Sequence, residues 1–260
     1  MRFVTLQREG YTEPGVLLGG ELIGIGGAGF ESMLSVIAGG ADAMDRVRRW
    51  LKNPPPGEPF DPAKTRLPAP VPRPPKIVCI GLNYSDHAAE SKLPIPETPT
   101  VFAKFQTAVT GHRHPIVLPK SSVKPDYEAE FAVVIGPGGR HIPEDRWREH
   151  VFGYTIANDV SARDFQMATT QWMIGKTFDT FAPIGPAIVT ADEIEDPHNL
   201  DISLTLSGEV MQSSNTCNLI FGVPKLIAFL SSVFTLEPGD EVVVRVEGLG
   251  ELVNPVVAEG

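Results

Sequence analysis

The residues best suited to chemistry are acidic side chains in two short segments. The segment KPDYEAEFAVVIG places Glu128 and Glu130 two residues apart on a predicted strand, so both side chains leave the same face. Two carboxylates on one face of an apolar strand are unfavourable to bury unless a proton or a cation lies between them. Taken alone, such a pair more often faces solvent.

The second acidic segment, GYTIANDVSARDFQ, changes that balance. Asp159 ends an apolar predicted strand, and Arg163 and Gln166 follow on a predicted helical turn. Three carboxylates without a neighbouring cysteine suit Mg²⁺ or Mn²⁺ rather than zinc, and they leave coordination positions for water and a chelating substrate. The predicted metal ligands are Glu128, Glu130 and Asp159.

Two basic residues accompany the acids. Arg163 lies in the second segment, and Lys176 stands in WMIGKTFDTFAPIGP, just before an aromatic and proline-rich turn. Both would offset the acidic charge and bind substrate oxygens, the arginine as a two-pronged donor and the lysine as a point charge. The alternative is that both are ordinary surface cations.

A possible acid–base pair lies in GLNYSDHAAES. His87 and Glu90 are three residues apart and would share one face of a helix. A histidine can deprotonate water, and a neighbouring glutamate can orient its ring and stabilise its charged form. Such a pair by itself is more often a surface feature.

One apparent motif does not fit its required context. GIGGAG matches the glycine pattern of dinucleotide-binding sites, which must lie between a strand and a helix of a βαβ unit. The preceding GVLLGGELI instead indicates a hairpin, and no second parallel strand follows at the right distance. We interpret the string as a glycine-rich turn.

The order of predicted elements indicates three regions. Residues 1–53 form a small leading unit of short strands and turns followed by one amphipathic helix, ADAMDRVRRWLKN, with Met44, Val47 and Leu51 at helical spacing. Residues 54–75 are proline-rich and are interpreted as a linker.

Residues 76–260 form the third region, the predicted catalytic domain, and are mostly strands. Its two predicted helices are SARDFQMATTQW, with a capping box of Ser161 and Asp164, and VPKLIAFLSS, with Pro224 in its first turn. The expected class is β-rich α+β, without repeats or regular alternation of strands and helices. The predicted strands are KIVCIG, PIVLP, EAEFAVVIG, VFGYTIAND, PIGPAIVT, LDISLTLSG and EVVVRVEG.

Composition narrows the class of protein. The 260 residues are 42% hydrophobic and 21% charged, as in globular enzymes, and the net charge of −10 argues against a nucleic-acid partner. No apolar stretch approaches the roughly 20 residues that span a bilayer, and the N-terminus lacks a secretory signal, so we expect a cytoplasmic protein without a membrane partner. The two cysteines show no CxxC spacing.

Taken together and in this order, the segments resemble the fumarylacetoacetate hydrolase family. The resemblance rests on GLNYSDHAAE, YEAEFAVVIG, GYTIANDVSARDFQ, GKTFDTFAPIGP and VEGLGELVNPV, and extends from about Lys76 almost to the end. It implies a mixed β-sandwich roll with a small, variable N-terminal α/β appendage. It also implies a homodimer.

The resemblance implies roles for individual residues. Glu128, Glu130 and Asp159 match the family's metal-binding acids, and Lys176 matches a lysine that contacts substrate oxygens. Arg163 and Gln166 match positions that line the site, and Lys104 in VFAKFQTA falls near the pocket. His87 and Glu90 match a dyad on a mobile lid in members that hydrolyse acylpyruvates or decarboxylate oxaloacetate.

The sequence departs from the family pattern near residue 240. Family members continue from a phrase like FTLEPGD into a strand and loop with TGTPxGVG, and then reach a second PGD. Here LEPGD runs directly into EVVVRVEGLG, so residues 236–240 stand for both turns. A natural deletion, a stretch omitted from the sequence as written and a rearranged rim are the three explanations. Metal binding is expected to survive, while substrate affinity or folding suffers.

Two classes of function follow. The leading hypothesis is a hydrolase of carbon–carbon bonds in small β-diketo or acylpyruvate-type acids that uses Mg²⁺ or Mn²⁺. An isomerase, tautomerase or decarboxylase of related keto or enol acids is the alternative within the enzymes, because these reactions share an enolate. The alternative of another class is an inactive family member that retains the metal site for stability.

Overall fold

The chain folds around one large mixed β-sheet. The computed structural model describes residues 1–90, 92, 94–243 and 249–260. Among these residues the strands run in the order β4-β3-β2-β1-β13-β11-β10-β16-β5-β6, with β7 beside β13. The strands of this sheet are β1 (Arg2–Gln7), β2 (Thr12–Leu18), β3 (Glu21–Gly24), β4 (Glu58–Pro59), β5 (Ile77–Gly81), β6 (Thr100–Lys104), β7 (Val109–Thr110), β10 (Ala129–Ile135), β11 (Val151–Asn158), β13 (Ala182–Thr190) and β16 (Glu241–Val243).

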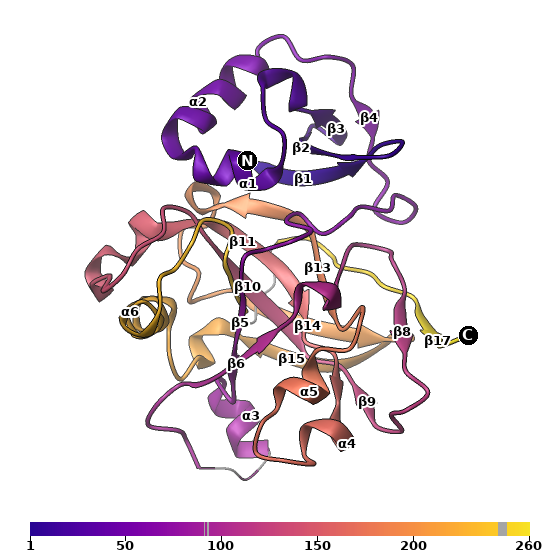
Figure 1. The fold of residues 1–260 in the computed structure, drawn as a ribbon, viewed down its shortest axis with the longest axis vertical. Coiled ribbons are helices and arrows are strands. Elements are labelled where there is room, and N and C mark those ends of the chain that lie inside the picture. Colours follow the sequence, from indigo (N-terminus) through magenta and orange to yellow (C-terminus); the bar gives the residue numbers. More distant parts are fainter. Residues whose placement is uncertain (91, 93, 244–248) are drawn as a thin grey trace.

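Smaller elements surround the sheet (Figure 1). Three two-stranded pairs are β9 (Pro125–Asp126) with β12 (Ser161–Ala162), β14 (Asp201–Leu206) with β15 (Glu209–Asn215), and β8 (Ile116–Leu118) with β17 (Val256–Ala258). The α-helices are α1 (Met33–Ala38), α2 (Gly40–Trp50), α3 (Ser85–Glu90), α4 (Arg163–Gln166), α5 (Met173–Lys176) and α6 (Val223–Val233). Short 3₁₀ helices are η1 (Gly26–Ala28), η2 (Gln106–Ala108), η3 (Glu144–His150), η4 (Ala191–Glu193) and η5 (Thr216–Asn218). The class is the predicted β-rich α+β.

The leading residues extend the main sheet. β1 pairs antiparallel with β2 and also with β13, where Arg2 lies opposite Val189. The predicted amphipathic helix is α2, and its buried residues include Val47. The sequence patterns missed α1, which begins at the N-cap Ser32. GIGGAG is a 3₁₀ turn after the β2–β3 hairpin, as the interpretation of that string requires.

The proline-rich segment 54–75 packs against the rest of the protein. Leu67, Ala69 and Val71 are buried. The Thr5 hydroxyl donates a hydrogen bond of 2.6 Å to the Pro70 carbonyl. This segment therefore touches both of the regions that it connects, and the predicted domain boundaries stay a prediction.

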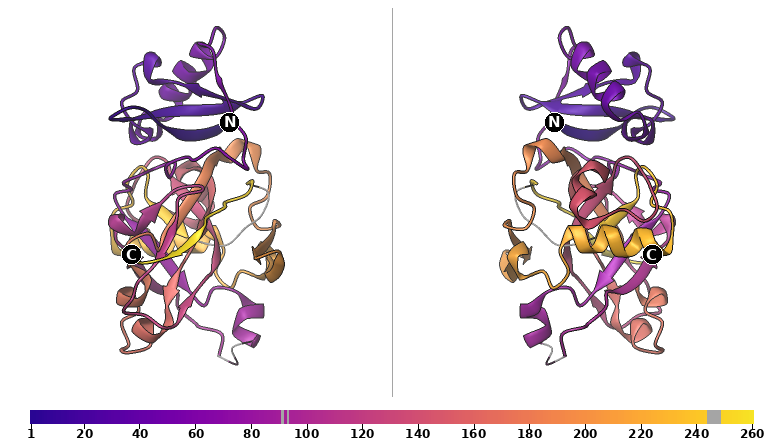
Figure 2. Two further views of the ribbon diagram at one scale, coloured as in Figure 1. Left: turned by 90° about the vertical axis from the view of Figure 1, so that its right-hand side faces the viewer. Right: turned by 90° about the vertical axis from the view of Figure 1, so that its left-hand side faces the viewer.

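β10 separates two parts of the core. Its alternate residues Phe131, Val133 and Ile135 pack in one apolar cluster with residues of α6. Ala132 points to the other face and packs with buried residues of β5, including Cys79. Figure 2 shows α6 on the outside of the main body, below the N-terminal unit. Because side chains alternate along a strand, Glu130 lies on the face of Ala132.

A tight turn leads into β16. The Asp240 amide donates to the Glu237 carbonyl, and Gly239 has a φ of +84°, which favours glycine. β16 then lies between β10 and β5, so Glu241 enters the interior of the sheet. The predicted strand EVVVRVEG is thus described only as residues 241–243, and residues 244–248 lie outside the described residues.

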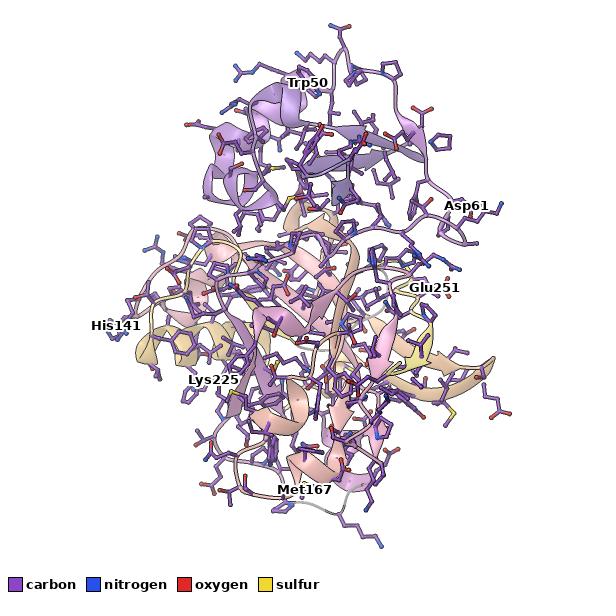
Figure 3. The ribbon with its side chains drawn as sticks, turned by 45° about the vertical axis from the view of Figure 1, so that its right-hand side comes forward. Trp50, Asp61, His141, Met167, Lys225 and Glu251 are labelled. Atoms are coloured by element: carbon purple, nitrogen blue, oxygen red, sulfur yellow. The ribbon has the colours of Figure 1, made fainter. Side chains whose placement is uncertain are left out.

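The predicted helix VPKLIAFLSS is α6 and begins at Val223 as predicted, whereas only residues 163–166 of the predicted helix SARDFQMATTQW are helical, as α4. α6 has Pro224 in its first turn, as predicted. The predicted capping box of Ser161 and Asp164 is wrong, because Ser161 belongs to β12 and α4 begins at Arg163 without a side-chain cap. Helices α4 and α5 lie at the end of the molecule opposite the N-terminal unit, with Met167 and Trp50 marking the two ends (Figure 3).

Candidate active site

The two predicted acidic segments meet at neighbouring strand ends. Glu128 immediately precedes β10, and Asp159 immediately follows β11. These strands are antiparallel neighbours, and the Asp159 amide donates a hydrogen bond of 2.7 Å to the Glu128 carbonyl. The Asp159 side chain is only 5% exposed and that of Glu128 is 19% exposed. Pairing of β10 with β11 therefore brings together acids that are 31 residues apart in the chain.

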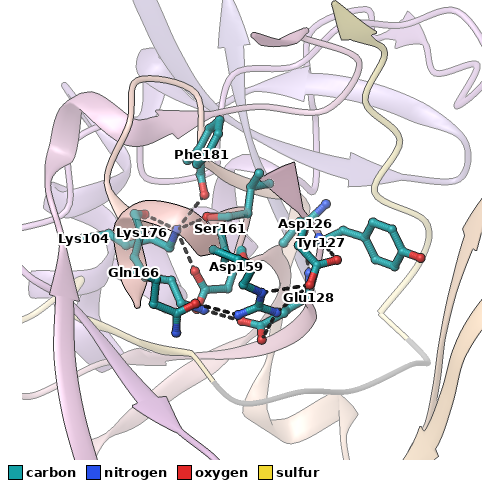
Figure 4. Close-up of polar contacts among 12 residues, drawn as sticks. Lys104, Asp126, Tyr127, Glu128, Asp159, Ser161, Gln166, Lys176 and Phe181 are labelled. Atoms are coloured by element: carbon teal, nitrogen blue, oxygen red, sulfur yellow. Dashed lines mark hydrogen bonds and ion pairs between the residues drawn. The ribbon is translucent and has the colours of Figure 1, made fainter. Parts of the chain in front are cut away.

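Lys176 joins the two carboxylates (Figure 4). It is the last residue of α5, and its side chain is 3% exposed. The ammonium donates to Asp159 Oδ2 at 2.9 Å and also to Glu128 Oε2. One ammonium within reach of both groups means that the two carboxylates lie close enough to share a cation.

Lys104 lies on the other side of Asp159. Its ammonium forms an ion pair of 2.6 Å with Asp159 Oδ1. It also donates to the carbonyls of Val160 and Phe181, at 3.0 and 2.8 Å, and to that of Lys176. Protein acceptors thus surround this buried ammonium, an arrangement that holds the backbone around Asp159. Its predicted contact with substrate stays a prediction.

Arg163 and Gln166 lie on α4 beside Glu128. The guanidinium of Arg163 donates from Nη2 to Glu128 Oε1 at 2.8 Å and from Nη1 to Gln166 Oε1 at 2.8 Å. It also donates from Nε to Asp126 Oδ2 at 2.8 Å. Asp126 was not among the predicted site residues. It precedes Glu128 by two positions, so the alternation that paired Glu128 with Glu130 contained the information to find it.

The cations decide the charge of Glu128. Burial raises the pKa of this carboxyl, but Lys176 and Arg163 outweigh burial and lower the pKa to about 2. Burial also opposes the charge of Lys176, while Asp159 and Glu128 raise its pKa above the usual value. Near neutral pH, Glu128 is therefore an anion and Lys176 a cation.

The position of Glu130 follows from its place on β10 and from its effect on the pKa of a nearby thiol. It pairs with Ala157 across β10 and β11 and is partly buried. Burial raises the pKa of the buried Cys79 thiol, and the carboxylates of Asp159 and Glu130 raise it further. Both acids therefore lie near this thiol, which is part of the core beneath the site.

The predicted metal ligands do not form a closed group of acids in the structure. Within the ranges that the structure describes, no three His, Cys, Asp or Glu side chains form a metal-binding group. The Lys176 ammonium instead lies between two of the predicted ligands, Glu128 and Asp159. The available donors are nevertheless all carboxylate oxygens, two of them sharing one cation, and this donor set fits a hard divalent ion.

His87 and Glu90 lie apart from this cluster. Both are on α3, and both are exposed. In the described part of the chain, neither side chain has a hydrogen bond or ion pair to the other or to the acids. α3 is attached through Asp86, which accepts hydrogen bonds from Ser214 at 2.5 Å and Asn218 at 3.2 Å.

A cavity of about 640 Å³ lies beside the ends of β10 and β11 that carry the acids. Ala129 and Asn158, which are paired across these strands, line it. Ala157, which forms the adjacent pair with Glu130, also lines it. Asp126 lies at the border, because it lines the cavity and also pairs with Arg163.

Comparison with known proteins identifies the family of this chain. The profile of the family described as "Fumarylacetoacetate (FAA) hydrolase C-terminal" matches residues 76–244. The chain belongs to the fumarylacetoacetate hydrolase family. This match includes every residue of the site described above.

Two curated relatives of this family are oxaloacetate tautomerases. A mitochondrial enzyme of Bos taurus is 46% identical over 212 residues, covering 81% of this chain and 67% of the relative. A mitochondrial enzyme of Rattus norvegicus is 43% identical over 251 residues, covering 92% of this chain and 79% of the relative. As in these relatives of the fumarylacetoacetate hydrolase family, the chain is an enzyme.

Solved structures of the family confirm the predicted fold. Maleylpyruvate hydrolase from Sphingobium sp. SYK-6, in complex with manganese(II) ion and pyruvate, superposes with a TM-score of 0.85 at 28% identity, and 100% of each chain is covered. The 2-hydroxyhepta-2,4-diene-1,7-dioate isomerase from Mycobacterium marinum gives 0.79 at 30% identity, covering 100% of this chain and 99% of that chain. The chain therefore has the fold of the fumarylacetoacetate hydrolase family. Among the residues described, no helix is long and apolar enough to cross a bilayer.

Proposed function

We propose that the protein is a divalent-metal-dependent tautomerase of a small 2-oxo dicarboxylic acid such as oxaloacetate. The oxaloacetate tautomerases of Bos taurus and Rattus norvegicus, 46% and 43% identical, support the reaction and the class of substrate. The observation that carries the proposal is the buried contact of Lys176 with both Glu128 and Asp159. It places a charged donor beside two anionic metal-ligand candidates in one site.

The predicted metal ligands in this proposal are Glu128, Glu130 and Asp159. When bound there, Mg²⁺ or Mn²⁺ would act as a Lewis acid for the substrate's carbonyl oxygen and lower the free energy of the enolate. The manganese in the maleylpyruvate hydrolase structure supports a divalent metal in the family. The identity of the metal in this chain is part of the proposal.

The basic residues supply hydrogen bonds to the dianionic substrate. Lys176 would hold, from Nζ, the oxygen that is a carbonyl in one tautomer and a hydroxyl in the other. Arg163 would pair with a substrate carboxylate, for which its planar guanidinium is suited. Burial of Lys176 excludes water and strengthens its interaction with the charge that develops on this oxygen.

The position of α3 favours tautomerisation over hydrolysis in this arrangement. Tautomerisation moves a proton and needs no attacking water, whereas hydrolysis needs a base that activates water. His87 and Glu90, the predicted water-activating pair, are exposed and make no side-chain contact with the acids in the part of the chain that is described. A tautomerase therefore does not depend on these two residues to activate water.

Carbon–carbon bond hydrolysis is the second candidate. The likeness to maleylpyruvate hydrolase supports it, with a TM-score of 0.85. Figure 1 shows α3 at the same end of the molecule as α4 and α5, so movement of α3 toward the cluster would deliver His87 and Glu90. In that reaction His87 would remove a proton from the attacking water.

The test is an absorbance assay of enol oxaloacetate with purified protein and Mn²⁺. Faster loss of the enol absorbance than in buffer, abolished by chelator and by Glu128→Ala, supports the tautomerase. Cleavage of acetylpyruvate into pyruvate and acetate, with no effect on oxaloacetate, would instead support the hydrolase. Binding of Mn²⁺ without turnover of either acid would support the inactive metal-binding family member.

The oligomeric state and the cellular location of the protein are also proposed. We expect a homodimer, which sedimentation of the purified protein would test. We also expect the cytoplasm, and the mitochondrial location named for the Bos taurus and Rattus norvegicus relatives is the competing outcome. Fractionation of cells that produce the protein would distinguish the two.

A further inference from the structure

Asp126 holds the guanidinium that contacts the acidic cluster. Asp126 Oδ2 accepts a hydrogen bond of 2.8 Å from Arg163 Nε and lies 2.8 Å from Nη2 in an ion pair. Nη2 also contacts Glu128 Oε1 at 2.8 Å, so one nitrogen is shared between two carboxylates. The remaining nitrogen, Nη1, donates to Gln166. All three nitrogens of Arg163 therefore have an acceptor.

Backbone hydrogen bonds hold Asp126 and Arg163 close together. β9 pairs antiparallel with β12, with Asp126 opposite Ser161. The Arg163 amide donates a hydrogen bond of 2.9 Å to the Lys124 carbonyl, which continues the same pairing. Asp126 on β9 and Arg163, the first residue of α4 directly after β12, are thus held next to each other, and their side-chain pair forms without a long flexible connection.

The contact restricts how Arg163 can bind Glu128. A guanidinium and a carboxylate prefer a pair of parallel hydrogen bonds. Because Asp126 takes Nε and shares Nη2, Arg163 contacts only Oε1 of Glu128 and leaves Oε2 to Lys176. Without the charge of Asp126, Arg163 would be free to bind both oxygens of Glu128 and remove them from a metal or substrate.

We propose that Asp126 is a positioning residue, which fixes Arg163 and thereby keeps Glu128 available to the metal and the substrate. This inference rests on the proposed function for its effect on turnover. Asp126 itself is 41% exposed, so its ion pair contributes little to stability. Its role is to orient Arg163 and, through Arg163, Glu128.

The test compares Asp126→Asn and Asp126→Glu with the wild type. The control is Asp201→Asn, because Asp201 is an exposed aspartate that accepts a hydrogen bond from Asn215 outside the site. Replacement of a residue that orients a metal ligand typically lowers metal affinity or activity about 10- to 100-fold. We expect Asp126→Asn to weaken Mn²⁺ binding by roughly that factor in calorimetry and to lower kcat, with an unchanged melting temperature. Asp126→Glu should recover most of both.

A second measurement works without metal or substrate. The Nε–H of Arg163, held by Asp126, should give a protected side-chain resonance in ¹⁵N spectra of the metal-free protein. We expect Asp126→Asn to shift this resonance and speed its exchange with water, whereas Asp201→Asn leaves it unchanged. An unchanged Arg163 resonance in Asp126→Asn overturns the inference, whatever the activity. A shifted resonance in a protein that does not convert oxaloacetate would uphold the positioning of Arg163 and reject the proposed function.

Discussion

The Lys176 ammonium donates a hydrogen bond of 2.9 Å to Asp159 Oδ2, deep in the protein. The same ammonium contacts Glu128, and Lys104 contacts the other oxygen of Asp159. Removing one partner from such a buried pair leaves an uncompensated charge, which is strongly unfavourable. A divalent ion bound by Glu128 and Asp159 would compete with Lys176 for these oxygens. Metal binding and release of the Lys176 ammonium toward substrate are therefore expected to be linked.

Replacement of Lys104 should mainly affect stability. Lys104→Met leaves Asp159 and three backbone carbonyls without the ammonium that they now contact. Loss of a buried partner typically destabilises by roughly 3–5 kcal/mol, so we expect a decrease of that order in the free energy of unfolding. Urea denaturation would measure it. Lys225→Met is the control, because Lys225 is an exposed residue of α6 (Figure 3), and equal effects of the two changes would contradict the role given to Lys104.

Addition of Mn²⁺ should stabilise the protein. A ligand that binds only the folded state at about 100 times its Kd stabilises by about 2.7 kcal/mol. We expect a rise in melting temperature with Mn²⁺, and loss of that rise in Glu128→Gln. The exposed Glu149, paired with Arg146 on the surface, supplies the matched control Glu149→Gln. No change in melting temperature with Mn²⁺ in the wild type would count against the metal site.

Replacement of His87 should distinguish the two candidate reactions. A general base typically contributes about 10²- to 10⁴-fold to the rate of the step it catalyses. If the protein is a tautomerase, we expect His87→Ala to change oxaloacetate turnover by less than about threefold, because no water is activated. Steady-state kinetics with oxaloacetate and acetylpyruvate would measure both activities. A loss of 100-fold or more on oxaloacetate would show that His87 takes part in the reaction.

Stability should fall as pH rises because of Glu241. This side chain is fully buried, and both carboxylate oxygens lack a hydrogen-bond partner among the described residues. Burial, assisted by the neighbouring Asp240, raises the pKa of Glu241 from 4.5 to about 8. Between these two values the folded state holds a proton that the unfolded state releases. The contribution of Glu241 to stability is therefore fully present below pH 4.5, and it is lost progressively as pH rises to about 8.

The magnitude of this effect is on the order of 4 kcal/mol. Free energies of unfolding at pH 5 and pH 8 would measure it, and Glu241→Gln should flatten the dependence. Glu241→Leu should in addition be more stable than the wild type at pH 8, since it removes an unpartnered polar group from the sheet. The surface variant Glu149→Gln should keep the original dependence. The same slope in Glu241→Gln and wild type would show that other groups cause it.

The sequence by itself identified the family and most members of the acidic cluster. Glu128, Asp159, Lys176, Arg163 and Gln166 were predicted to share a site, and contacts in the structure link them. This was possible because alternation along a strand is local, and because the order of the motifs is specific. The catalytic and metal-binding roles of these residues stay predictions.

Only the tertiary structure decided what lies beside these residues. Pairing of β9 with β12 places Asp126 against Arg163, and pairing of β1 with β13 joins the leading unit to the main sheet. Such contacts join segments 37 to 187 residues apart, so the local sequence of one segment does not indicate its partner. The burial of Glu241 follows in the same way, since the local sequence does not show that β16 is inserted between β10 and β5, in the interior of the sheet where this side chain is buried.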